Sequence, residues 1–242
     1  MSILEDLRGN FGESLGRLVL GSKPDGSEIH KLIGFWPRPL IRFPRHLDYE
    51  WKIGLHWYLK RIEGNRVLDT GFVEHLGFTK LLVELGFEVY GVDLKGYSAR
   101  EFKAIQCLVW ETSHHCSGFD TIVANSLLEH LGLRCYGQPE FKEAQKATID
   151  DFYEILNPKG LLLVQVPYGR YPILVRYRNQ DFYRISTSES LSVLLEGFEI
   201  EEKVFFIKAT KGWIEASESI ANKVQQGGGF PSCMAYIKAR KV

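Results

Sequence analysis

The sequence predicts an α/β fold in which helices cover both faces of a mostly parallel, doubly wound sheet. Strand-like and helix-like patterns alternate over roughly 100 residues, which is the order expected of parallel strands joined by crossover helices. Residues 160–166 form a near-continuous apolar run, typical of a strand buried on both faces. The 242 residues are 45% hydrophobic and 25% charged, so the chain can bury a sizeable core.

The expected elements follow one another along most of the chain. The first is a helix over residues 49–62, because Trp51, Leu55, Tyr58 and Ile62 recur at helical spacing. Further helices are expected at residues 78–85, 141–156, 188–195 and 218–224. Strands are expected at residues 66–70, 88–93, 102–108, 119–125, 160–166, 198–207 and 233–239. We therefore expect an N-terminal extension over residues 1–48 and one α/β domain over residues 49–242.

The overall charge and hydropathy exclude some classes of function. Thirty basic and thirty acidic residues cancel, which gives no strong nucleic-acid signal. No apolar run reaches the roughly 20 residues that a membrane span needs. The N-terminus carries acidic residues and no apolar signal core, so we expect a cytoplasmic protein, with a homodimer left open.

The cysteines give no sign of a metal site. They stand at positions 107, 116, 135 and 233, and none belongs to a Cys-x-x-Cys pair. His114, His115 and Cys116 are adjacent, but no second ligand pair is spaced to complete a tetrahedron. We expect reduced thiols and no metal.

Ligands of doubly wound sheets bind beyond the carboxyl ends of the strands. This rule directs attention to residues 69–77, 93–97, 107–112, 125–137 and 167–172. Gly71 follows the first strand, where a glycine lets the backbone approach a ligand closely. Asp93 ends the second strand, where a ribose-binding carboxylate is expected. The alternative for Asp93 is a turn residue before Lys95.

Four segments in order resemble the motifs of the class I S-adenosylmethionine-dependent methyltransferases. They are Val67-Leu-Asp-Thr-Gly71, Gly91-Val-Asp-Leu94, Phe119-Asp-Thr-Ile-Val-Ala-Asn-Ser-Leu-Leu-Glu-His-Leu131 and Phe152-Tyr-Glu-Ile-Leu-Asn-Pro-Lys-Gly-Leu-Leu-Leu-Val-Gln-Val-Pro167. The resemblance covers about residues 60–170 and implies a Rossmann-like, seven-stranded sheet with S-adenosyl-L-methionine as cofactor.

A second, narrower resemblance concerns the segment Glu129-His-Leu-Gly-Leu-Arg-Cys-Tyr-Gly-Gln-Pro139. It looks like the Glu-His-x-Gly-Leu-x-x-Tyr-Gly-x-Pro signature of a largely uncharacterised methyltransferase branch, and this resemblance implies a link with surface-glycan genes. The resemblance implies methyl transfer to a small-molecule or glycan hydroxyl.

The resemblance also implies roles for individual residues. The cofactor would be held by Asp69, Gly71, Asp93, Leu94 and Ser126, with Asp69 orienting the loop and Leu94 against the adenine. The substrate mouth would be formed by Glu129, His130, Tyr136 and Tyr168. His130 is the first choice of base for a hydroxyl proton, because its ordinary pKa of about 6.5 suits neutral pH. Glu129 is the second choice, and a purely packing role for His130 is the alternative.

The chain departs from the family pattern at two places. Val73 and Glu74 stand in the first loop, and Val73 takes the place of a second glycine. We expect a valine there to resist a positive φ and to fill cofactor space, unless Gly77 substitutes in a rebuilt loop. The region 105–110 also lacks the acid that would hold the adenine amino group. These departures favour a second hypothesis, a catalytically silent protein of the same fold that acts as a binding or partner subunit.

Exposed aromatic and basic residues offer a further set of candidates. Sugar faces could stack on the aromatic residues Trp36, Trp51, Trp57, Tyr168 and Tyr171, although such residues more often serve the core. The segment 170–178 sets three arginines among apolar and aromatic residues. It either covers the pocket or contacts an anion, or it is a solvated basic loop.

Overall fold

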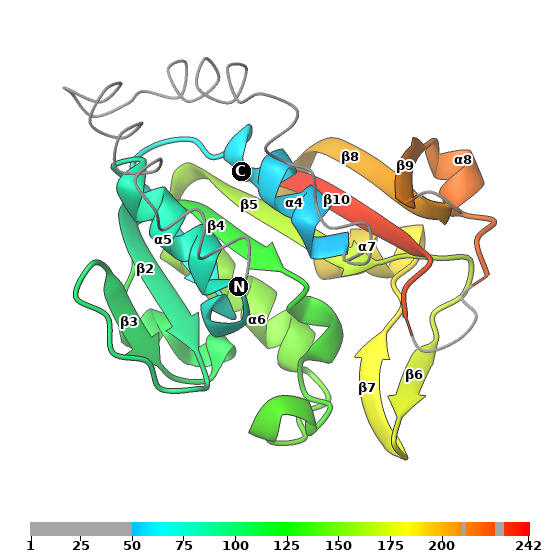
Figure 1. Cartoon of the computed structure of the whole chain (residues 1–242), viewed down its shortest axis with the longest axis horizontal. Coiled ribbons are helices and arrows are strands. Elements are labelled where there is room, and N and C mark those ends of the chain that lie inside the picture. Colours follow the sequence, from blue (N-terminus) through cyan, green and yellow to red (C-terminus); the bar gives the residue numbers. More distant parts are fainter. Residues whose placement is uncertain (1–49, 210–211, 226–229) are drawn as a thin grey trace.

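The computed structural model describes residues 50–209, 212–225 and 230–242, and its centre is an eight-stranded sheet (Figure 1). The strand order is β3-β2-β1-β4-β5-β10-β8-β9. The strands β1 to β5 run parallel, whereas β10, β8 and β9 are antiparallel to their neighbours. The expected extension over residues 1–48, the residue Trp36 and the side chain of Trp51 lie outside the description.

The main elements have the following bounds. The strands of the sheet are β1 Arg66–Thr70, β2 Glu88–Asp93, β3 Lys103–Gln106, β4 Phe119–Asn125, β5 Leu156–Pro167, β8 Phe198–Ala209, β9 Gly212–Ala216 and β10 Cys233–Lys241. A separate hairpin is formed by β6 Leu174–Tyr177 and β7 Gln180–Arg184. The α-helices are α4 Glu50–Leu59, α5 Leu76–Glu84, α6 Ala144–Ile155, α7 Ser188–Leu194 and α8 Glu218–Ala221. Short 3₁₀ turns occupy Phe72–His75, Val109–His114, Leu128–His130 and Cys135–Gly137.

Helices cover the sheet on both faces, as the apolar pattern predicts. Successive residues of a strand point to opposite faces. Val67 of β1 accordingly packs with α4 and α5, and its neighbour Leu68 packs in the cluster that contains α6 and α7. The fold prediction of a doubly wound, mostly parallel α/β domain is therefore confirmed. No helix among the described residues is long and apolar enough to cross a membrane.

Two parts of the β-structure differ from the expectation. The sheet has eight strands rather than seven, because β9 pairs with the outer edge of β8. β9 is half-exposed along its length and lacks the alternation that marks a half-buried strand. The hairpin β6–β7 begins within the segment 170–178, for which the sequence leaves open a cover over the pocket, an anion contact or a solvated basic loop. In addition, the segment Phe119–Leu131, whose family resemblance implies a helix after the fourth strand, forms only the 3₁₀ turn Leu128–His130 after β4.

The turn after β1 is built around a buried phenylalanine. Gly71 has a φ of 69°, and its N–H donates to the carbonyl of Val92 at 2.8 Å. Phe72 then enters the core with 0% exposure and packs edge-on against Phe102, with ring centroids 5.3 Å apart. A side chain at Gly91 would place its Cβ 2.7 Å from the Phe72 ring, so the ring fits only because β2 carries a glycine there.

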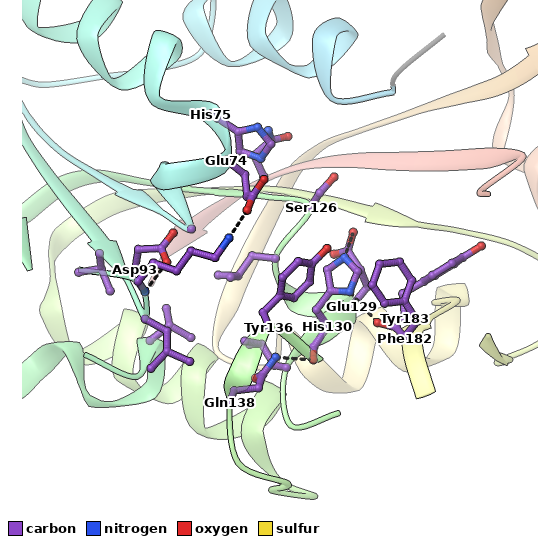
Figure 2. A pocket seen from close by; sticks show the side chains of 18 of the residues that line it. Glu74, His75, Asp93, Ser126, Glu129, His130, Tyr136, Gln138, Phe182 and Tyr183 are labelled. Carbon is purple, nitrogen blue, oxygen red and sulfur yellow. Dashed lines mark hydrogen bonds and ion pairs between the residues drawn. The ribbon is translucent and has the colours of Figure 1, made fainter. Parts of the chain in front are cut away.

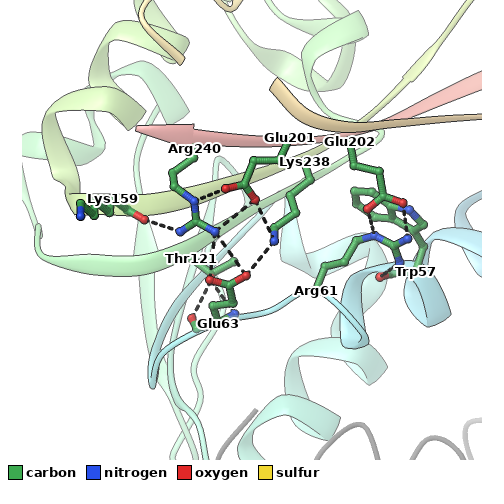
Figure 3. A network of polar contacts seen from close by, with 9 residues as sticks. All are labelled: Trp57, Arg61, Glu63, Thr121, Lys159, Glu201, Glu202, Lys238 and Arg240. Atoms are coloured by element: carbon green, nitrogen blue, oxygen red, sulfur yellow. Dashed lines mark hydrogen bonds and ion pairs between the residues drawn. The ribbon is translucent and has the colours of Figure 1, made fainter. Parts of the chain in front are cut away.

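A network of ion pairs ties the antiparallel end of the sheet to the loop before β1 (Figure 3). Lys238 contacts Glu63 at 2.7 Å and Glu201 at 2.8 Å, and Arg240 pairs with both carboxylates. Hydrogen bonds from Arg240 and Lys238 lower the pKa of Glu201 from 4.5 to about 2. The network therefore stabilises the folded state mainly while these carboxylates are ionised.

The first prediction concerns acid stability. Because the folded-state pKa of Glu201 lies below its ordinary value, its contribution is complete above pH 4.5 and is lost as the pH falls toward about 2. The variant Glu201→Gln should flatten the loss of stability across that window, measured by urea unfolding at a series of pH values. Glu199→Gln, on the same strand but outside the network, is the control. Equal behaviour of the two variants would contradict the assignment.

The second prediction concerns the fit between Gly91 and Phe72. Gly91→Ala should lower the free energy of unfolding by about 1–3 kcal/mol, because the new methyl group overlaps a fully buried ring. In a Phe72→Ala background the same change should cost much less, since the overlap is gone. Additive effects of the two substitutions would show that the two side chains do not compete for one space.

Candidate functional site

A cavity of about 490 Å³ opens at the carboxyl ends of the parallel strands (Figure 2). All five of the segments singled out from the sequence contribute to it. Of the site residues predicted from the sequence, the cavity brings together Gly71, Asp93, Leu94, Ser126, Glu129, His130 and Tyr136. The cavity also has lining residues that the sequence did not predict as site residues, and they include Glu74, His75, Leu108, Val109, Trp110, Asn125, Gln138, Phe182, Tyr183 and Phe230. The volume suits a small organic ligand.

Asp93 holds the two loops that form one end of the cavity. One carboxylate oxygen accepts a hydrogen bond from the N–H of Val73 at 3.1 Å, and the other accepts from the N–H of Lys95 at 2.8 Å. An ionised carboxylate has about four acceptor sites, so Asp93 keeps capacity for ligand hydroxyls. The turn role and the ligand role of Asp93 are therefore compatible.

The structure corrects the expectation for Val73. This residue lies in the 3₁₀ turn Phe72–His75, and its side chain packs against the apolar cluster of α4 and α5 rather than lining the cavity. In this loop only Gly71 has a positive φ, so the valine does not need that conformation. Gly77 lies in α5 and does not line the cavity, so it does not take the place of the missing second glycine of the loop.

Glu74 and Lys95 form an ion pair across this end of the cavity. Both residues line it and both are about half-exposed. The carboxylate of Glu74 raises the pKa of Lys95. The acidic residue in the loop is thus neutralised by a cation from the neighbouring strand end.

Asp69 does not line the cavity, which corrects the prediction of a direct ligand contact. It is 0% exposed, and its carboxylate accepts a hydrogen bond from the hydroxyl of Thr79 at 2.7 Å. Burial raises the pKa of Asp69 to about 7. This hydrogen bond links β1 to helix α5 across the loop between them. Asp69 can therefore orient the loop without touching the ligand.

The wall beyond β3 is apolar. Leu108, Val109 and Trp110 line the cavity where the family pattern would place an acid, and Leu94 lines it from the neighbouring strand end. The aromatic ring of Trp110 is braced by Phe141, with ring centroids 5.6 Å apart. This surface can hold a flat apolar ring without a hydrogen bond from a carboxylate.

The floor of the cavity contains an unsatisfied donor. Asn125 ends β4 with 2% exposure, and its Oδ1 accepts a hydrogen bond from the hydroxyl of Tyr58 at 3.3 Å. Within the described part of the chain its Nδ2 has no hydrogen-bond partner. The next residue, Ser126, has a φ of 49° and donates to Gln165 at 3.0 Å. A buried donor without a partner costs free energy, which a bound acceptor would recover.

His130 lies at the other end of the cavity with its ring orientation fixed. Its Nδ1 lies 2.6 Å from the carbonyl oxygen of Phe182 on β7. A carbonyl only accepts, so Nδ1 carries the proton and Nε2 carries the lone pair of the neutral ring. Nε2 lies 4.0 Å from a carboxylate oxygen of the buried residue Glu129. Burial lowers the pKa of His130 to about 4, so the ring is neutral at physiological pH.

The segment 129–139 shapes the loop around His130. Gln138 donates from Nε2 to the carbonyl of His130 at 2.9 Å and accepts from the N–H of Gly132 at 2.9 Å. Gly132 has a φ of 72°, and a Cβ there would lie 2.0 Å from the carbonyl oxygen of Phe141. The ring of Tyr136 packs edge-on against His130 at 5.1 Å. This segment therefore fixes both the peptide and the ring of His130.

Tyr168 does not reach the cavity, which corrects its predicted place at the substrate mouth. Its ring is 0% exposed and packs on Phe205 at 4.8 Å. Its hydroxyl donates to Asn222. The aromatic residues that do line that side are Phe182 and Tyr183, which belong to β7. The sequence Phe182-Tyr-Arg184 also resembles the methyltransferase branch that the segment 129–139 resembles, and this resemblance was the available signal for both residues.

In the part of the chain that the structure describes, no group of three or more His, Cys, Asp or Glu residues is arranged to hold a metal ion. The chemistry available in the cavity is thus that of a carboxylate at one end, a neutral imidazole at the other and apolar walls between them.

Comparison with solved structures shows the same fold. The chain is similar to 1,6-didemethyltoxoflavin-N1-methyltransferase of Burkholderia thailandensis, with 20% identity, a TM-score of 0.56, and coverage of 89% of this chain and 84% of that one. A methyltransferase of Archaeoglobus fulgidus that depends on S-adenosylmethionine has 20% identity and a TM-score of 0.56, with 78% and 92% coverage. A counterpart from Methanosarcina mazei has 16% identity and a TM-score of 0.50, with 75% and 94% coverage. The first structure contains bound S-adenosylhomocysteine.

Comparison with protein families assigns the chain more directly. No curated protein matches it. A family model described as a methyltransferase domain, however, matches residues 43–202, which is well over half of the 242 residues. With the fold and the cavity as described, the chain belongs to the family of S-adenosylmethionine-dependent methyltransferases.

Proposed function

We propose that this protein binds S-adenosyl-L-methionine in the cavity and transfers its methyl group to a hydroxyl of a small molecule or glycan. The observation that carries the proposal is the single cavity in which Asp93 and Gly71 lie at one end and His130 at the other. Bound cofactor supplies an electrophilic methyl group. The residues of the chain bind it, orient the acceptor and receive a proton.

The cofactor end of the cavity fits such a ligand. Asp93 would hold the ribose hydroxyls, and Leu94 with the wall at Trp110 would enclose the adenine. Gly71 and Ser126 would face the amino-acid part. Asn125 also lines the cavity, and its buried Nδ2, which has no partner among the described residues, would donate to the cofactor carboxylate once the amide turns toward it. These contacts replace the missing second glycine and the missing acid.

At the acceptor end, His130 would take the hydroxyl proton. Its Nε2 has the lone pair, because Nδ1–H is held by the Phe182 carbonyl. The carboxylate of Glu129 at 4.0 Å would stabilise the imidazolium that forms. Alignment of the methyl donor and the acceptor hydroxyl between the cavity walls would further accelerate methyl transfer. The hypothesis of a silent scaffold loses its main support, since Val73 does not occupy ligand space.

The third prediction tests cofactor binding. S-adenosylhomocysteine at about 100 times its Kd should stabilise the protein by about 2.7 kcal/mol, measured as a shift of the melting transition and by calorimetry. Asp93→Ala should abolish most of the shift, whereas Asp150→Ala, on the exposed side of α6, should not. A folded wild-type protein whose melting is unchanged by the ligand would refute the proposal.

Val73→Gly separates the two hypotheses for the first loop. Because the valine packs into the core, its removal should lower stability without raising the affinity for S-adenosylhomocysteine. An increase in affinity on calorimetric titration would instead indicate that Val73 obstructs the cofactor.

The fourth prediction concerns the state of His130. Its imidazole should titrate near pH 4 with the proton on Nδ1 in the neutral form, as measured by nitrogen NMR of the labelled histidines. His130→Gln, which identifies the resonance, should leave S-adenosylhomocysteine binding intact and reduce methyl transfer by about 100-fold or more. An ordinary titration near 6.5 would contradict the buried, carbonyl-bound geometry.

A further inference from the structure

The hairpin β6–β7 extends outward from the acceptor end of the cavity (Figure 1). Its two tip residues, Arg178 and Asn179, have φ values of 51° and 65°, as a tight two-residue hairpin turn requires. Its base is fixed to the site, because Arg184 donates to the carbonyl of Leu131 at 2.5 Å and the Phe182 carbonyl holds His130. The hairpin is thus an outward continuation of the site.

A row of aromatic rings runs from the cavity along this hairpin, and we call it the aromatic track. It consists of Tyr136, Phe182 and Tyr177, with neighbouring ring centroids 5.9 and 5.7 Å apart. The inner end contacts His130, whose ring lies 5.1 Å from those of Tyr136 and Phe182. Tyr136 is 50% exposed and Tyr177 is 52% exposed, so large aromatic surfaces face solvent beside the reacting group.

A cation accompanies each end of the aromatic track. Lys95 lies over the Tyr136 ring at 5.8 Å, and Arg178 lies over the Tyr177 ring at 5.2 Å. The surrounding segment 170–184 contains four arginines and one aspartate, although the whole chain has no net charge. Positive charge is therefore concentrated on the hairpin and the residues just before it, next to Tyr177 and Phe182 of the track.

We propose that the aromatic track binds an acidic oligosaccharide whose terminal or internal sugar presents the acceptor hydroxyl to His130. The proposal rests on the function proposed above and narrows its substrate class. The C–H faces of sugar rings pack well on aromatic rings, whose faces are negative. Carboxylates or phosphates along the chain would pair with Arg178.

A nucleic acid strand is the less favoured occupant of the aromatic track. Binding of its regular phosphates calls for a continuous row of available cations. Here Arg176 is paired with Asp181 at 2.8 Å, and Arg184 is held by the Leu131 carbonyl. The remaining cations suit a ligand with sparse negative charges.

The segment that leads into the hairpin offers a matched control for the test. Tyr171 is 50% exposed and carries Arg170 over its ring at 5.0 Å, so it resembles the pair of Tyr177 and Arg178. Tyr171 and Arg170 line a separate hollow and belong to neither the track nor the main cavity. The double variants Tyr177→Ser/Arg178→Ser and Tyr171→Ser/Arg170→Ser remove the same two residue types, the first pair from the hairpin and the second from the segment before it.

The test is calorimetric titration of the full chain, saturated with S-adenosylhomocysteine, with hexamers of galacturonate or mannuronate. The wild type should bind an acidic hexamer and not the neutral maltohexaose. The Tyr177→Ser/Arg178→Ser variant should raise the Kd by about tenfold or more, and the control variant by less than about twofold. Both variants should bind S-adenosylhomocysteine as the wild type does.

Each other outcome overturns the proposal. These outcomes are the absence of binding by either acidic hexamer, equal loss in the two variants, or tighter binding of a single-stranded oligouridylate than of the acidic hexamers. If S-adenosylhomocysteine binds while the hexamers do not, only the substrate class fails. If S-adenosylhomocysteine does not bind, the proposed function fails.

Discussion

The hydrogen bond from the Val73 N–H to the Asp93 carboxylate joins the turn after β1 to the end of β2, and the cavity depends on it. The burial of Phe72 directs the chain into the 3₁₀ turn and places Val73 N–H near β2. Gly71 adopts the left-handed conformation that this turn needs, and Gly91 leaves space for the Phe72 ring. The loop lacks a second glycine, yet it leaves the cavity open because its apolar side chains point into the core.

Two segments also act together at the end of the cavity that contains His130. The loop 129–139 and the hairpin β6–β7 meet at His130, where one carbonyl fixes the imidazole tautomer and Gln138 fixes the peptide. The imidazole is buried, so its neutral form is retained at physiological pH. Two fixed ends and an apolar wall define the cavity, and in the proposed function its residues would contribute by aligning the methyl donor with the acceptor.

Much of the fold could be predicted because the inner strands are marked by strong apolar patterns. The bounds of β1, β2 and β4 agree with the expectation, and all the segments at strand ends reach the cavity. The edge strand β9 and the hairpin could not be predicted, since their residues are half-exposed and their pairing is set by tertiary contacts. Sequence position alone also could not separate Tyr168, which turns into the core, from Tyr183, which lines the cavity. Residue type and order likewise do not reveal that the side chain of Val73 points away from the cavity.

In the proposed binding mode, the loop after β1 admits the cofactor between Asp93 and Asn125. A crystal structure of the protein with S-adenosylhomocysteine would show whether it does. The ribose hydroxyls should lie on the Asp93 carboxylate, the adenine against Leu94 and Trp110, and the ligand carboxylate near the side chain of Asn125, with the Val73 to Asp93 hydrogen bond intact. A ligand bound elsewhere, or a loop that must unfold from Phe72 to Glu74 to receive it, would refute this binding mode.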